Sequence, residues 1–190
     1  MNKLLIIIGT VILFSCNNNK NPQIIIKTNF GNIEAELFLD KAPKSVAAFL
    51  SYIDSGFYKN SSFYRVLLAE TMSDNNTGLI QGGIWESNSK KLGELPGIKH
   101  ESTKQTGLSH TSGTLSLARL AAGTANSEFF ICIGDQTEYD SSKALSSDGL
   151  GYAAFGRVVS GMDIVRKIQN QPSKGQAFTK AIVILNIDRL

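Results

Sequence analysis

Two neighbouring segments near the start of the chain are strand-like, and the second alternates apolar with polar residues. Residues 23–28 hold an isoleucine-rich run, and residues 32–39 alternate apolar with acidic side chains. The tripeptide Asn29-Phe30-Gly31 joins the two segments. Alternation with a period of two is typical of strands that bury one face, and a short glycine-containing connection is typical of a hairpin. The pattern predicts a β-hairpin at the start of the folded part.

A pattern with a period near 3.6 follows this hairpin. Pro43 suits the first turn of a helix, and apolar side chains recur at positions 46, 49, 50 and 53. Gly56 stands where a residue with positive φ would end the helix. The spacing predicts one amphipathic helix that covers an apolar surface. A second helix is predicted over residues 162–170, after Ser160-Gly161.

The rest of the chain contains short apolar runs separated by connections rich in Gly, Ser and Asn. These runs do not alternate with helical segments, so a parallel sheet built from β-α-β units is not expected. With the hairpin they make eight strands. We predict a mainly β fold, a closed eight-stranded antiparallel β-barrel with two α-helices as lids. The six further strands are expected at residues 62–68, 79–84, 114–118, 129–133, 153–159 and 181–188.

Composition and charge agree with one globular domain. The chain has 190 residues, of which 42% are hydrophobic and 18% are charged. The net charge is only +3, and the basic residues are scattered along the chain. A nucleic-acid partner is therefore not expected.

The first residues resemble an export signal. Lys3 precedes the uncharged apolar run 4–14, which is about half of the ~20 residues needed to span a bilayer. Leu13-Phe14-Ser15-Cys16 resembles a bacterial lipobox, after which Cys16 becomes the lipid-modified first residue. The alternative is an ordinary signal peptide in which Cys16 is incidental.

This start of the chain sets the expected domain boundaries. We predict a lipoprotein signal peptide at 1–15, a polar lipid-anchored tether at 16–23 and a folded domain at 24–190. The protein is then expected outside the cytoplasm, on the periplasmic side, held to the membrane through Cys16. The one other cysteine, Cys132, lies in an apolar run and is interpreted as a small buried side chain.

Several chemistries lack support in the sequence. The two histidines, His100 and His110, have no acid or cysteine at the spacing of a metal site. No Gly-x-Ser-x-Gly motif is present, and the Gly-x-Gly-x-x-Ala match at 149–154 leads into a strand rather than a helix. What remains is Arg65, a permanent charge inside an apolar strand, where it is costly unless it is paired or used.

Five segments in order resemble the signature blocks of the cyclophilin-type peptidyl-prolyl cis-trans isomerases. The resemblance covers residues 24–190 and implies the same barrel, with an active groove on its outer face. The blocks are Phe63-Tyr64-Arg65-Val66, Leu79-Ile80-Gln81-Gly82-Gly83, Gly113-Thr114-Leu115-Ser116-Leu117-Ala118-Arg119, Asn126-Ser127-Glu128-Phe129-Phe130-Ile131 and Gly151-Tyr152-Ala153-Ala154-Phe155-Gly156-Arg157-Val158.

The same resemblance assigns roles to single residues. It implies that Arg65 is the principal catalytic side chain and that the backbone at Arg119 holds the substrate chain. It also implies proline-containing polypeptides as partners and no cofactor, metal or nucleotide. We expect a monomer. The residues implied to line the proline pocket and its neighbourhood are Leu79, Gln81, Ala118 and Phe130.

The chain departs from the family pattern at several positions in or near this site. The connection 69–78 is longer than the usual tight turn, and we predict a surface loop beside the groove. Gly78 stands where the family commonly has a pocket phenylalanine, which predicts a thinner pocket wall. Glu128 replaces a common glutamine, and we expect its charge to help hold Arg65 or to favour basic peptides.

Two further departures concern aromatic residues. Tyr152 stands where many eukaryotic members have histidine, although tyrosine is familiar in bacterial members. The tryptophan linked with cyclosporin binding is best matched by Tyr139, which predicts weak inhibition by that drug.

Two other functions stay open at this point. The first is a cyclophilin-fold binding module or holdase that grips proline-containing segments with little turnover, and the altered wall at Gly78 motivates it. The second is a barrel that binds a small ligand inside. Strands with this many large side chains are expected to fill the interior, which disfavours the ligand barrel.

Overall fold

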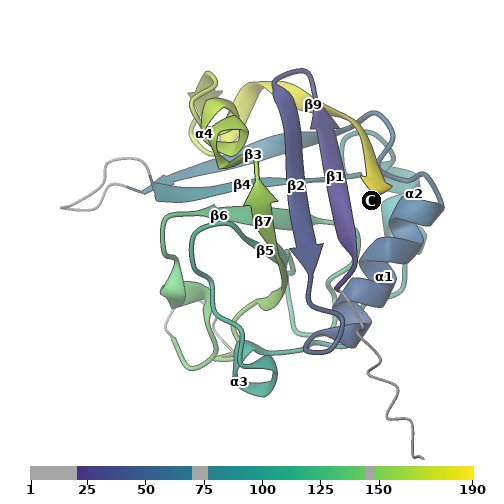
Figure 1. Ribbon diagram of the computed structural model, residues 1–190, viewed down its shortest axis with the longest axis vertical. Helices are drawn as coiled ribbons and strands as arrows, with labels where there is room; N and C mark the ends of the chain where they lie inside the picture. Colours follow the sequence, from purple (N-terminus) through teal and green to yellow (C-terminus); the bar gives the residue numbers. More distant parts are fainter. Residues whose placement is uncertain (1–20, 70–76, 144–147) are drawn as a thin grey trace, which may run out of the picture.

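Eight strands wrap into one closed antiparallel barrel (Figure 1). The computed structural model describes residues 21–69, 77–143 and 148–190. Around the barrel the order is β1-β2-β7-β5-β6-β4-β3-β9, and β9 pairs back onto β1. The predicted fold class is therefore confirmed. The eight strands are β1 Gln23–Thr28, β2 Gly31–Leu37, β3 Ser61–Ala69, β4 Thr77–Gly83, β5 Thr114–Leu117, β6 Phe129–Ile133, β7 Ala153–Ser160 and β9 Ala177–Arg189.

The strands differ from the predicted ranges mainly at their ends. A short strand, β8 (Ser173–Lys174), pairs with the start of β9 and was not predicted. β1 begins at Gln23, one residue before the predicted domain start. The predicted signal peptide and Cys16 lie outside the described residues. Within the described ranges, no helix is long and apolar enough to cross a membrane.

The two predicted helices are α1 (Pro43–Asp54) and α4 (Met162–Gln169). Gly56 follows α1 with φ of +69°, as expected of a residue that ends a helix. The expectation of only two helices was wrong, because α2 (Ser89–Glu94) and α3 (Thr103–Thr106) are also helical. Both are too short to show a periodic pattern. Each begins at a side-chain cap, with Asn88 and Ser102 accepting hydrogen bonds from backbone N–H groups.

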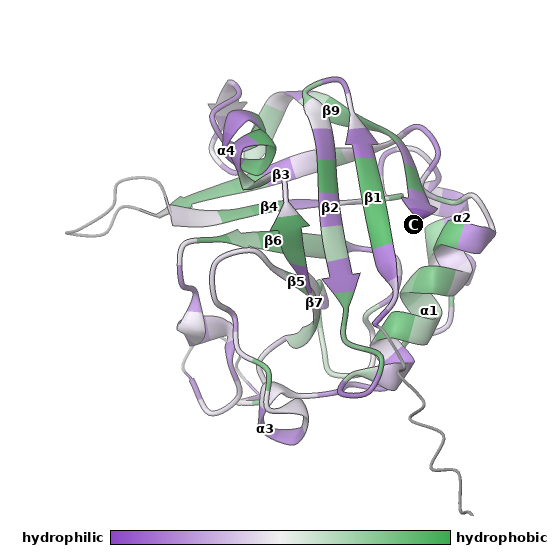
Figure 2. Ribbon diagram, in the orientation of Figure 1, coloured by the Kyte–Doolittle hydropathy of each residue, from purple (hydrophilic) through white to green (hydrophobic). Residues whose placement is uncertain are grey.

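Side chains fill the interior of the barrel. Along β2, hydrophobic and hydrophilic residues alternate (Figure 2), and the apolar ones point inward with no exposed area. Phe49 of α1 closes one end, with its ring 5.1, 5.3 and 5.0 Å from those of Tyr58, Phe129 and Phe155. These rings occupy the space that an internal ligand would need. The small-ligand barrel is therefore disfavoured.

A β-bulge in β3 decides which side chains reach the outer face. Phe63 pairs with Gly82 of β4, but the next paired residue is Arg65, opposite Gln81. Tyr64 is thus the extra residue of the bulge. Phe63 and Val66 are buried in the core, while Tyr64 and Arg65 are partly exposed. The bulge explains how an arginine occupies an apolar strand without entering the core.

The hairpin of β3 and β4 extends into the predicted insertion. Leu68 pairs with Gly78, and Ala69 pairs with Thr77. The ends of the segment 69–78 are therefore strand, where a loop was expected throughout. Residues 70–76 lie outside the described part, so the loop predicted there stays a prediction.

Candidate active site

A groove with a cavity volume of about 570 Å³ lies beside β3, β4, β5 and β6. All eight residues predicted for the site in the folded domain line it, although they come from distant parts of the chain. Those eight are Arg65, Leu79, Gln81, Ala118, Arg119, Glu128, Phe130 and Tyr152. The lining also includes side chains that the sequence did not indicate, among them Tyr64, Trp85, Leu92, Leu120, Thr124 and Asn126.

Two amide side chains hold the guanidinium of Arg65. Its Nη1 donates to Oε1 of Gln81 at 2.8 Å, and its Nε and Nη2 donate to Oε1 of Gln176 at 3.0 and 2.6 Å. In the described part of the chain, no carboxylate oxygen lies within ion-pair distance of Arg65. The amides fix the orientation of the group and bring no opposite charge to it. Among the described residues, the alternative of a structural salt bridge at Arg65 therefore finds no partner.

Phe130 forms the apolar floor of the groove. Along β6 the side chains alternate between the barrel core, which receives Phe129 and Ile131, and the outer side, which receives Phe130 and Cys132. Phe130 packs with Leu79 and Cys132 in a second, smaller apolar cluster. Its ring meets that of Tyr152 edge-on at 5.5 Å. As predicted, Cys132 is a small buried side chain, and burial raises the pKa of its thiol.

Glu128 does not contact Arg65 directly, and its carboxylate is held by the barrel instead. Its side chain is nearly buried, with 7% of the residue exposed. Oε2 accepts a hydrogen bond from the hydroxyl of Tyr64 at 2.7 Å. Oε1 accepts from the backbone N–H groups of Ile84 and Trp85 at 2.7 and 3.2 Å. A carboxylate held in this way is a fixed internal acceptor rather than a free surface charge.

Burial and hydrogen bonding act on the Glu128 carboxyl in opposite directions. Burial raises its pKa, and the hydrogen bonds from Tyr64, Ile84, Ser127 and Trp85 partly oppose that rise. The pKa of Tyr64 is raised by burial and by the neighbouring Glu128 charge. Tyr64 therefore keeps its proton and acts as the donor in their hydrogen bond.

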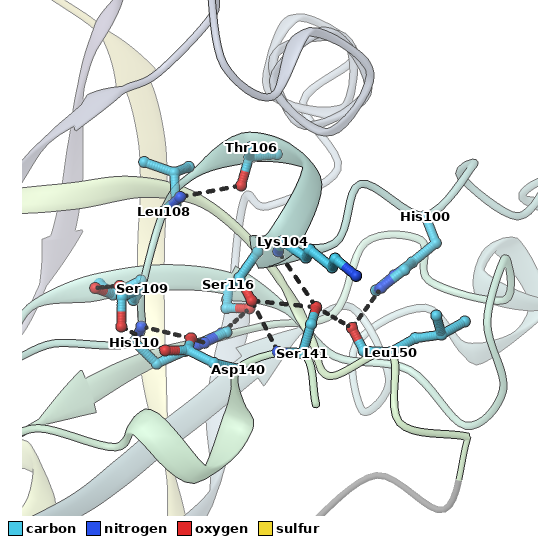
Figure 3. A network of polar contacts seen from close by, with 12 residues as sticks. His100, Lys104, Thr106, Leu108, Ser109, His110, Ser116, Asp140, Ser141 and Leu150 are labelled. Carbon is cyan, nitrogen blue, oxygen red and sulfur yellow. Dashed lines mark hydrogen bonds and ion pairs between the residues drawn. The ribbon is translucent and has the colours of Figure 1, made fainter. Parts of the chain in front are cut away.

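A buried histidine, His110, packs against Phe130. Figure 3 shows its polar contacts with Asp140 and Ser116. The ring of His110 stacks on Phe130 with centroids 5.9 Å apart. Its Nδ1 lies 2.6 Å from Oδ1 of Asp140, and its Nε2 lies 2.9 Å from Oγ of Ser116. Burial lowers the pKa of His110, against an opposing effect of Asp140. The neutral ring thus donates from Nδ1 to Asp140 and accepts at Nε2 from Ser116.

Comparison with known proteins places this chain in a family. The sequence profile described as cyclophilin type peptidyl-prolyl cis-trans isomerase/CLD matches residues 23–189. The chain belongs to this cyclophilin family. Named peptidyl-prolyl cis-trans isomerases are similar to it, one from Acinetobacter baylyi at 37% identity over 91% of this chain and 85% of the relative. Peptidyl-prolyl cis-trans isomerase B of Escherichia coli is 39% identical over 77% of this chain and 84% of that protein.

Solved structures agree with the fold. A cyclophilin-type isomerase from Cryptosporidium parvum superposes with a TM-score of 0.70 at 24% identity, covering 90% of this chain and 98% of that one. A second structure of that protein, solved in the presence of the dipeptide Ala-Pro, superposes with a TM-score of 0.68, also at 24% identity, over 87% of this chain and 96% of that one.

Within this cyclophilin, the side chain of Arg119 supports a loop. It is 4% exposed and forms an ion pair with Asp148 at 2.7 Å. Its Nε donates to the carbonyl of Gly151 at 2.9 Å, and the guanidinium lies over the ring of Tyr152 at 5.4 Å. Arg119 thus fixes the segment that brings Tyr152 to the groove, a role separate from the one expected of its backbone.

The aromatic wall of the groove contains the residue matched to the drug-contacting tryptophan. Tyr139 lies beside Phe130 at 5.6 Å and beside Tyr152 at 5.4 Å. Gly78 occupies β4 opposite Leu68 and Ile133 and offers no side chain to the groove. The predicted thinner wall is consistent with this position but stays a prediction.

Three of the residues that sequence reasoning missed contact Arg65, Gln81 or Tyr64. Gln176 is 111 positions from Arg65, and no local pattern indicates their contact. Trp85 is 59% exposed and packs against Tyr64 with ring centroids 6.3 Å apart. Tyr64 was recognised only as part of a motif.

In the described ranges, no group of three or more His, Cys, Asp or Glu residues is placed to hold a metal ion.

Proposed function

We propose that this cyclophilin isomerises X–Pro bonds in exported proteins and that Arg65 stabilises the twisted bond. The main support is the geometry of Arg65. It is a charged donor held by two neutral amides at the edge of an apolar groove whose floor is Phe130. The structure of the Cryptosporidium parvum relative solved in the presence of Ala-Pro supports a proline-containing ligand. The names of the bacterial relatives support the reaction.

The physical task explains these residue types. The barrier to rotation about a peptide bond is about 18–20 kcal/mol, because the C–N bond has partial double-bond character. Twisting the X–Pro bond returns the lone pair to the prolyl nitrogen. A guanidinium aimed at that nitrogen then gains a hydrogen bond that hardly exists in the planar ground state. Such an interaction lowers the barrier rather than only strengthening binding.

Arg65 supplies only part of the rate. A hydrogen bond to a charged group contributes about 1.5–3 kcal/mol, whereas a ~10⁵-fold acceleration requires about 7 kcal/mol. The remainder comes from holding the proline ring against Phe130 and Leu79 while the preceding carbonyl rotates. Every group in this proposed step belongs to the chain itself.

The proposed location rests on the start of the sequence. The apolar run 4–14 and the lipobox-like Leu13-Phe14-Ser15-Cys16 support export and a lipid anchor at Cys16. Proline isomerisation takes tens to hundreds of seconds without catalysis and is slow enough to limit folding. A monomeric isomerase tethered on the periplasmic side would act on proteins that fold after export.

An assay of turnover separates this proposal from a proline-binding module or holdase, which Gly78 favours. The rate of cis-trans exchange in an Ala-Pro peptide is measured for the folded domain, residues 21–190. Arg65→Ala is expected to reduce kcat/KM roughly 10- to 150-fold, the equivalent of one charged hydrogen bond. Arg157→Ala, an exposed arginine on β7 outside the groove, is the matched control. Equal rates for wild type and Arg65→Ala would reject the catalytic role and favour the binding module.

A further inference from the structure

A chain of three hydrogen bonds connects Glu128 to Arg65. Tyr64 donates from its hydroxyl to Oε2 of Glu128 at 2.7 Å, and it accepts from Nε2 of Gln81 at 2.8 Å. Oε1 of Gln81 then accepts from Nη1 of Arg65 at 2.8 Å. The bulge in β3 makes this possible, because it places two successive side chains, Tyr64 and Arg65, on the groove side.

The two ends of this chain give it a single direction. An ionised carboxylate only accepts hydrogen bonds, and a guanidinium only donates them. The one hydroxyl proton of Tyr64 is therefore directed at Glu128, and the phenolic oxygen is left to accept. Gln81 must then turn its NH₂ group toward Tyr64 and its carbonyl oxygen toward Arg65. The charge of Glu128 therefore orients the Tyr64 hydroxyl so that it supports the one orientation of the Gln81 amide that Arg65 can use.

The anchor of the chain is itself rigid. Oε1 of Glu128 accepts from the backbone at Ile84 and Trp85 and from the hydroxyl of Ser127, which leaves Oε2 for Tyr64. Gly83 packs directly on the carboxylate, since a Cβ atom there would lie 2.3 Å from Oε1. Because the barrel fixes the Glu128 carboxylate on one side, the carboxylate constrains the position of Tyr64 and, through Tyr64, that of Gln81.

We propose that Glu128 and Tyr64 are positioning residues, which act on the reaction by fixing the amide of Gln81 and through it the guanidinium of Arg65. This inference rests on the proposed catalytic role of Arg65. It gives Glu128, which stands where a glutamine is common, a function that depends on its charge. A glutamine at position 128 that kept its oxygen on the backbone N–H groups of Ile84 and Trp85 would present an NH₂ group to Tyr64, so that two donors, this group and that of Gln81, would face the one phenolic oxygen.

The test combines turnover with a double-mutant cycle in the whole chain, purified in mild detergent. Tyr64→Phe keeps the ring against Trp85 and removes only the hydroxyl. It is expected to lower kcat about 3- to 10-fold with KM unchanged. Glu128→Gln is expected to cause a similar loss. The double variant is expected to be no slower than the slower single variant, because either change already breaks the chain.

Two controls separate positioning from a structural effect. Tyr52→Phe, on α1 and outside the groove, should leave kcat unchanged. In an Arg65→Ala background, Tyr64→Phe should have no further effect on the residual rate. Multiplied losses in the Tyr64→Phe/Glu128→Gln variant, a wild-type kcat for Tyr64→Phe, or an undiminished loss in the Arg65→Ala background would each overturn the inference. Tyr64→Phe alone decides the outcome if Glu128→Gln does not fold.

A readout independent of turnover distinguishes failure of this inference from failure of the proposed function. The ¹⁵N signals of the Arg65 guanidinium report how firmly that group is held. We expect faster guanidinium rotation in Tyr64→Phe than in wild type. If Arg65→Ala leaves turnover unchanged, the proposed function fails, but slow rotation in wild type still supports the positioning chain. Equal rotation rates in wild type and Tyr64→Phe would reject it.

Discussion

Acidification should destabilise the protein through His110. Its ring is fully buried, stacks on Phe130 and bonds to both Asp140 and Ser116. Burial lowers its pKa below the ordinary value of 6.5, so the folded state binds this proton less readily than the unfolded state. The corresponding stability is fully present above pH 6.5 and is lost as the pH falls through 6.5 toward the folded-state pKa. Each unit of lowering corresponds to about 1.36 kcal/mol of unfolding free energy.

The structure also gives the local reason for that loss. A proton added at Nε2 turns an acceptor into a donor that faces the Ser116 hydroxyl. Ser116 Oγ could then only accept from Nε2, so its own O–H would turn away and lose its acceptor in a fully buried position. Asp140 opposes the effect because it stabilises the charged ring, so the loss is smaller than burial alone would give.

Urea unfolding between pH 5 and pH 8 measures this effect. The wild type is expected to lose more unfolding free energy from pH 7 to pH 5 than His110→Gln. His100→Gln is the matched control, since His100 is the other of the two histidines and is partly exposed. His100→Gln should follow the wild-type curve. Parallel curves for wild type and His110→Gln would refute the reasoning.

Four shorter predictions follow from the groove and its supports. Gln176→Ala should lower kcat about 2- to 10-fold, because it removes the partly solvated bonds to Nε and Nη2 of Arg65, and a steady-state assay that finds no change would contradict this. Gly83→Ala should lower the free energy of unfolding, measured in urea, by about 1–3 kcal/mol, because φ of +151° disfavours a side chain and a Cβ atom would clash with the Glu128 carboxylate. A variant as stable as wild type would exclude that clash. Cyclosporin should inhibit only weakly, and a sub-micromolar inhibition constant would show the match of Tyr139 to tryptophan to be misleading. Deletion of residues 71–76 should change turnover or peptide selectivity if the predicted loop flanks the groove, whereas an unchanged profile would mark it as a tolerated insertion.

The barrel was predictable because its signal is local and repeated. Each strand is a short apolar or alternating segment bounded by Gly, Ser or Asn, and eight such segments without β-α-β alternation leave few architectures. The eight residues assigned to the groove were found for a different reason. Their motifs occur in a fixed order, and β4, β5 and β6 bring Gln81, Ser116 and Phe130 into register.

The features that escaped prediction depend on contacts far apart in the sequence or on single added residues. Gln176 reaches Arg65 only after the chain has closed the barrel and turned through β8 into β9. The bulge at Tyr64 breaks the period of two, so alternation would have placed Arg65 on the core side. The sequence indicated a negative charge at Glu128 near the site. It did not indicate that Glu128 bonds to the hydroxyl of Tyr64, because these two side chains meet only in the folded chain.

The arrangement of the groove separates two kinds of evolutionary change. Residues that line the groove lie next in sequence to residues that fill the core, as in Phe129 and Phe130 or Leu79 and Ile80. Neighbouring codons therefore serve stability and recognition separately. Divergence at one side of a strand can alter peptide preference while the other side preserves the fold. For protein engineering, the groove positions can be randomised in a library of variants without redesign of the barrel interior.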